Sequence, residues 1–105
     1  MGGIEHMPHL MVASPTFYSS KDEASFFAWL QSISGITQVV GTGRELRVTL
    51  RSPRVGEEAL RDLLALHWRY QLPMRALAAF LSSTNERWFA APDAYWHDAV
   101  FGAAA

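Results

Sequence analysis

Apolar and polar residues alternate most clearly between residues 36 and 51. In the segment LRVTLR, residues 46–51, three aliphatic residues alternate with three polar ones. A period of two is typical of a strand with one buried face. The preceding GTG, residues 41–43, supplies glycines that accept a positive φ in a tight turn. We therefore predict a β-hairpin in this region.

Antiparallel pairing across that turn divides the side chains of the hairpin between two faces. Val39 falls beside Leu46 on the predicted buried face. Ile36 and Val40 fall on the opposite face with Arg47. We expect that opposite face, which also carries Arg51, to point into water.

The segment before the hairpin has the spacing of an amphipathic helix. Its apolar residues recur three or four positions apart: Phe26, Leu30 and Ile33. Ser20 and Glu23 fit a capping box, in which each side chain accepts a hydrogen bond from an unpaired N–H of the first turn. Gly35 is expected to end the helix.

A longer helix is predicted to begin near Gly56 or Glu57, with acidic residues in its first turn and Arg69 in its last. Its apolar face comprises Ala59, Leu60, Leu63, Leu64, Leu66, His67 and Tyr70. Its other face comprises Glu58, Arg61, Asp62, Ala65 and Arg69. The strong segregation of the two faces indicates a helix that packs on a core.

Shorter helical pieces are predicted in the C-terminal third. Pro73 fits the first turn of a helix formed by PMRALAAFL. Ser83 and Glu86 form a second capping-box pattern before RWF. Asp93 is a candidate cap for a final helix, AYWHDAVF.

Together with a short apolar strand at 9–14, these elements predict an α+β fold. Their order is β-α-β-β-α-α followed by short C-terminal helical segments, with a sheet of about three strands covered by helices on one face. A chain of 105 residues is enough for one domain, which we place at 7–102. Residues 1–6 and 103–105 resemble remnants of cloning.

Composition narrows the functional classes. Half of the residues are hydrophobic and 18% are charged, which is typical of a globular domain. The chain has no cysteine, so disulfides and thiolate chemistry are excluded. A net charge of −1 gives no overall attraction to nucleic acid or anionic membrane. With no secretory signal and no run of about 20 apolar residues, we expect a cytoplasmic location.

The sequence contains no catalytic or metal-binding pattern that we identify, and we expect neither a metal nor a cofactor. His67 lies in the apolar helix face and is expected to be buried, neutral and hydrogen-bonded. His97 next to Asp98 is expected to be solvated surface. An enzyme centred on either histidine is the least favoured class.

Two groups of side chains are candidates for partner binding. The first is the set of arginines in and beside the hairpin: Arg44, Arg47, Arg51 and Arg54. The second is drawn from the aromatic tail at 85–102: Trp88, Tyr95 and Trp96. The tail either closes the open end of the core or leaves one or two rings exposed. Because neighbouring helical residues point about 100° apart, we expect Tyr95 or Trp96 to lie at the surface.

The preferred hypothesis is a small, non-enzymatic, bacterial-type domain that binds another protein, for example as an immunity or antitoxin-like inhibitor. A homodimer through the hairpin edge or the tail is equally compatible. The alternative is a nucleic-acid-associated regulator using the arginine face or a helix-turn-helix-like pair within 63–81. Nucleic acid is the less favoured partner, because the second helix of that pair offers one arginine and few base-reading side chains.

Overall fold

A computed structural model of the chain describes residues 8–102. The predicted cloning remnants and Met7 lie outside this range. The elements follow in the order β1 (His9–Ala13), α1 (Ser20–Ser32), β2 (Ile36–Thr42), β3 (Glu45–Leu50), α2 (Glu57–Arg69), the 3-10 helix η2 (Arg75–Phe80), α3 (Glu86–Phe89) and α4 (His97–Phe101).

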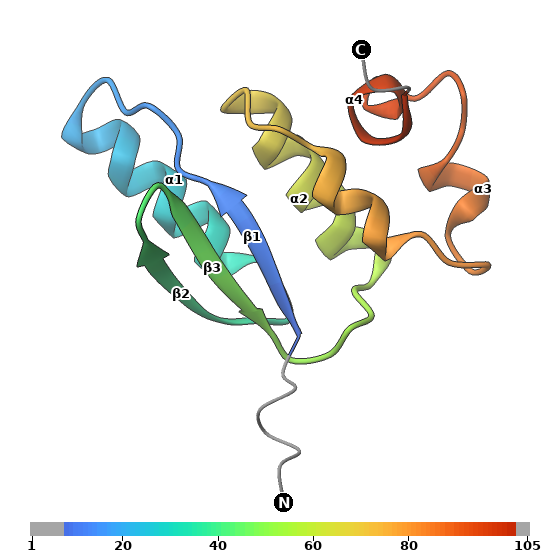
Figure 1. Cartoon of the computed structure of the whole chain (residues 1–105), viewed down its shortest axis with the longest axis horizontal. Helices are drawn as coiled ribbons and strands as arrows, with labels where there is room; N and C mark the ends of the chain where they lie inside the picture. The colour runs from blue at the N-terminus through green and yellow to red at the C-terminus, as the bar shows by residue number, and fades with distance from the viewer. Residues whose placement is uncertain (1–7, 103–105) are drawn as a thin grey trace, which may run out of the picture.

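The three strands form one antiparallel sheet with the order β1-β3-β2. The hairpin strand β3 is therefore central, and the separate strand β1 occupies the edge opposite β2. The predicted alternation is confirmed at Leu46, Arg47 and Val48, but Thr49, which was expected on the exposed face, is buried. Figure 1 shows α1 behind the sheet and the later helices beside β1. The α+β fold with helices on one face of the sheet is thus confirmed.

The hairpin turn includes only the last glycine of the GTG pattern. Gly41 and Thr42 belong to β2, and the connection consists of Gly43 and Arg44. Gly43 has a φ of 66°, which matches a two-residue turn with glycine at its first position. Thr42 pairs with Glu45 across this turn.

A β-bulge corrects the predicted position of Ile36. Val39 pairs with Val48 and Val40 with Arg47, as the simple register requires. The register shifts between Ile36 and Gln38, so that Ile36 pairs with Leu50. Because a shift of one residue moves a side chain to the opposite face, Ile36 packs on the core and not beside the arginines.

Helix α1 begins one residue earlier than the capping-box pattern indicated. Its N-cap is Ser19, whose side chain accepts a hydrogen bond from the Asp22 N–H at 3.1 Å. The Asp22 carboxylate in turn accepts from the Tyr18 N–H at 3.0 Å. The predicted Ser20–Glu23 pair is therefore wrong. The apolar stripe of α1 is confirmed, because Phe26, Leu30 and Ile33 are all buried.

Helix α2 supplies the largest share of the core. It begins at Glu57, as predicted, with Gly56 as N-cap. Its predicted apolar face is buried from Ala59 to His67. The helix ends in a Schellman motif, in which Leu72 N–H donates to the His67 carbonyl at 2.9 Å and Gln71 N–H to the Trp68 carbonyl at 3.2 Å.

The C-terminal third departs most from the predicted pattern. The segment after Pro73 forms a 3-10 helix, η2, in place of an α-helix. The predicted Ser83–Glu86 capping box is absent, and Asn85 organises the turn by accepting from Ser82 N–H and donating to the Phe80 carbonyl, both at 2.8 Å. Asp93 does not cap α4, whose N-cap is Trp96.

Candidate functional site

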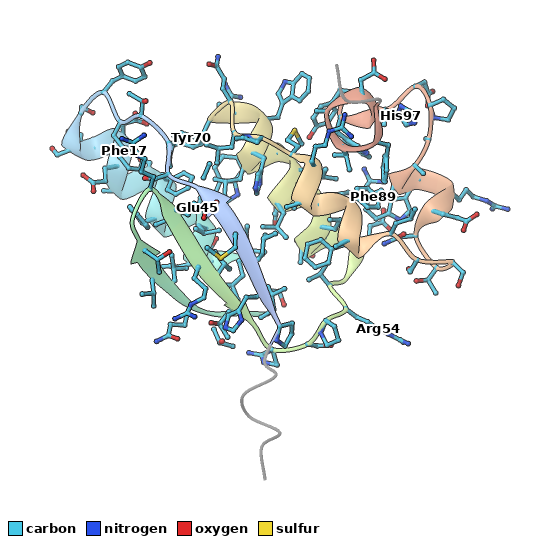
Figure 2. All side chains as sticks on the ribbon, viewed as in Figure 1. Phe17, Glu45, Arg54, Tyr70, Phe89 and His97 are labelled. Carbon is cyan, nitrogen blue, oxygen red and sulfur yellow. The ribbon has the colours of Figure 1, made fainter. Side chains whose placement is uncertain are left out.

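The four candidate arginines are all exposed, but they do not form one cluster. Arg44 lies in the hairpin turn, Arg47 lies in the middle of β3, and Arg51 follows its other end. The six residues of β3 span about 20 Å, which separates Arg44 from Arg51. Arg54 lies beyond that end and points away from the body of the protein (Figure 2). A single ligand group therefore cannot contact all four.

Arg47 has the only mixed environment of the four. The register places it between Met11 of β1 and Val40 of β2, and the accessible fractions of these neighbours are 39% and 37%. The three residues form one row across the outer face of the sheet. Arg47 and Arg51 do point into water, as predicted.

The aromatic tail mostly closes the core. Phe89 is fully buried, and Trp96, with an exposed fraction of 6%, donates its Nε1–H to the Phe89 carbonyl at 2.7 Å. Trp88 is half-buried, and the guanidinium of Arg61 covers its ring. Figure 2 shows Phe89 within the helical half of the molecule. Trp96 thus stabilises the fold and offers almost no surface to a partner.

Tyr95 is the tail aromatic that remains available. Its exposed fraction is 50%, in agreement with the expectation that Tyr95 or Trp96 lies at the surface. Its ring packs edge-to-face on Trp68 at a centroid distance of 5.0 Å. Trp68 is also 50% exposed. These two rings, with Trp29, Ala65 and Arg69, line an open hollow of about 440 Å³.

A second hollow, of about 470 Å³, adjoins the first at Arg69. It lies between the β1–α1 loop and the end of α2, and its lining includes Tyr18, Asp22, Tyr70 and Gln71. Tyr18 is 87% exposed. Burial, assisted by the negative charge of Asp22, raises the pKa of the Tyr70 hydroxyl, so this group remains a neutral donor at physiological pH.

These residues define a continuous surface around the C-terminal end of α2. We name it the α2-end surface and define it as Tyr18, Trp68, Arg69, Gln71 and Tyr95. Sequence reasoning identified only Tyr95. Trp68 could have been found from its position, because it lies about 100° around the helix from the buried His67 and so away from the leucine stripe.

The two histidines considered as candidates, His67 and His97, lie in different environments. His67 is buried and its Nδ1–H donates to the Leu63 carbonyl at 2.7 Å, which confirms the prediction of a buried, hydrogen-bonded residue. His97 lies at α4, with its Nδ1 at 3.3 Å from Asp98, whose carboxylate is fully exposed. Within residues 8–102, no three histidine or acidic side chains are close enough together to hold a metal ion.

Comparisons with known proteins do not add a functional assignment. No family model matches the chain, and neither the curated proteins nor the solved structures give a match. In the part of the chain that the structure describes, none of the helices has the length and apolarity needed to cross a membrane.

Proposed function

We propose that this domain acts by binding another protein through the α2-end surface. The observation that carries the proposal is the combination of two half-exposed rings, Trp68 and Tyr95, with the exposed guanidinium of Arg69 beside two hollows. Tryptophan, tyrosine and arginine are the residue types most enriched among those that dominate the energy of protein interfaces.

The charges of this surface favour a partner that carries a negative group. Within the described residues Arg69 forms no ion pair, whereas Arg61, about two helical turns earlier on α2, is paired with Glu57. A carboxylate from the partner could pair with Arg69 while aromatic or aliphatic side chains cover Trp68 and Tyr95. An immunity or antitoxin-like inhibitor, which requires only a complementary surface, is one form that this function would take.

Site-specific photo-crosslinking in the native cell tests the proposal. Two variants are made. A photoreactive amino acid replaces Tyr95 in the first variant, and it replaces Val40, a partly exposed residue of the sheet face, in the second. We expect the Tyr95 position to yield one defined protein adduct that the Val40 position does not. The same partner should bind the purified wild type and the variant Arg47→Glu, but not the double variant Trp68→Ala/Arg69→Glu.

Adducts that form only from the Val40 position, or binding that is lost in Arg47→Glu alone, would transfer the function to the sheet face. The alternative function, a nucleic-acid-associated regulator, would also use that face, where Arg47 lies between Met11 and Val40. Titration of labelled DNA and RNA at two salt concentrations distinguishes nucleic-acid binding from protein binding. Phosphate contacts would make the affinity fall steeply with salt, whereas a protein binder should bind neither nucleic acid.

A further inference from the structure

His67 presents a hydrogen-bond acceptor that the fold itself does not use. Its Nδ1 lies 2.7 Å from the Leu63 carbonyl, and a carbonyl can only accept, so Nδ1 carries the proton. In the neutral ring Nε2 then has a free lone pair. His67 lines an open hollow of about 380 Å³ despite an exposed fraction of only 1%.

The direction of Nε2 follows from the remaining contacts. Among the described residues, no fully buried side-chain nitrogen or oxygen lacks a hydrogen-bond partner. Nε2 has no partner within residues 8–102, so it is the atom that reaches the hollow. The acceptor therefore lies at the floor of the hollow, where the rest of its imidazole ring is enclosed by the core.

The walls of the hollow are mostly apolar. They consist of Trp68, Leu72, Met74 and Ala99, and Gln71 completes the lining beside His67. Leu72 and Met74 are buried, and α4 contributes Ala99. An indole ring and a thioether both pack favourably on an aromatic group. The site thus joins an aromatic-binding wall to a single acceptor.

We propose that this hollow binds a flat aromatic group that carries one N–H donor, of the indole type, with the donor directed at His67 Nε2. Such an aromatic N–H group can belong to a free small molecule or to a tryptophan side chain of a partner protein. The inference does not depend on the proposed partner surface, although Trp68 and Gln71 border both sites.

Two isomers of one size provide the decisive comparison. In 3-methylindole the N–H is free, whereas in 1-methylindole a methyl group replaces it. Titration of the isotope-labelled protein, followed by NMR, should shift the amide signals of Trp68, Leu72, Met74 and Ala99 and the Nε2 signal of His67. Since a hydrogen bond to a buried group contributes about 1–2 kcal/mol, 3-methylindole should bind about 10-fold more tightly.

Two variants separate the acceptor from the cavity. His67→Phe keeps a ring of similar size but removes the acceptor, so the two isomers should bind it equally. Ala99→Leu fills the hollow without altering His67 and should abolish binding of both. If His67→Phe does not fold, the isomer comparison in the wild type still decides the question.

The peptide Gly-Gly-Trp-Gly-Gly distinguishes the two sources of the ligand. Binding of the peptide with the same NMR shifts supports entry of a partner's side chain. Binding of free 3-methylindole alone supports a small-molecule ligand. Equal affinity for the two isomers in the wild type, no binding of either, or shifts confined to other parts of the protein would overturn the proposal. The crosslinking test of the α2-end surface has a separate readout, the adducts formed from Tyr95, so each proposal can fail without the other.

Discussion

The guanidinium carbon of Arg61 lies 4.2 Å from the centroid of the Trp88 ring and 6.0 Å from that of Trp96. The Nε of Arg61 also lies 2.8 Å from the Glu57 carboxylate, one turn earlier on α2. Arg61 therefore connects the polar face of α2 to the aromatic tail that closes the core.

This contact predicts a measurable effect of Arg61→Ala. We expect a loss of about 0.5–1.5 kcal/mol in the free energy of unfolding, because an exposed cation–π contact and an exposed ion pair each contribute at most about 1 kcal/mol. Glu57→Ala should cost less, since the contact with Trp88 remains. Urea unfolding measures both. An equal loss in the two variants would show that the ion pair, not the ring contact, accounts for the effect of Arg61.

Trp96→Phe should lower stability by about 1–3 kcal/mol, because the buried Phe89 carbonyl loses its hydrogen-bond donor. The matched variant Trp88→Phe removes a half-buried indole with no recorded hydrogen bond and should cost less. The comparison is made by chemical denaturation of the two proteins. If Trp88→Phe were the more damaging change, our assignment of Trp96 as the anchor of the tail would fail.

The pKa of His67 is lowered by burial, which outweighs the hydrogen bond to Leu63. The unfolded chain therefore takes up a proton near pH 6.5, before the folded protein does. The stability that comes from burying neutral His67 is therefore complete above pH 6.5, and it declines as the pH falls toward the pKa of His67 in the folded protein. Unfolding measured between pH 7.5 and 5 should show this decline in wild type and in His97→Gln, and a smaller decline in His67→Phe.

Gln71 has a φ of 59°, in the region where glycine is normally found at the end of a helix. Gln71→Gly should raise stability by about 0.5–1 kcal/mol, since glycine adopts this conformation without steric cost. Gln71→Ala retains the steric cost and should change stability little. Thermal melting distinguishes them, and equal stabilisation by both variants would exclude backbone strain as the cause.

Truncation of a side chain should lower stability strongly in the core and hardly at all on the outer face of the sheet. Leu63→Ala should cost about 2–5 kcal/mol, because Leu63 is fully buried. Arg47→Ala should change stability by no more than about 0.5 kcal/mol, since its side chain lies in water. Melting temperatures of both variants provide the test. Unfolding of the Arg47 variant would mean that this arginine holds the sheet together.

Much of the fold could be predicted from the sequence because its signals are local. The alternation in LRVTLR reflects the pleat of a strand, and the spacing of Phe26, Leu30 and Ile33 reflects the turn of a helix. Each pattern depends on neighbours in the chain, and each was confirmed by the burial of its aliphatic and aromatic residues. The candidate site was harder to predict from the sequence, since Tyr95 was the one member of the α2-end surface that was predicted.

Only the tertiary structure decided how distant segments meet. The bulge that turns Ile36 into the core arises where β2 must pair with β3 and also pack on the helices. The choice of Trp96 as buried and Tyr95 as exposed depends on the Phe89 carbonyl and on Trp68, a residue 27 positions earlier than Tyr95. Local propensity specifies the elements, whereas burial and hydrogen bonding between elements select which side chains reach the surface.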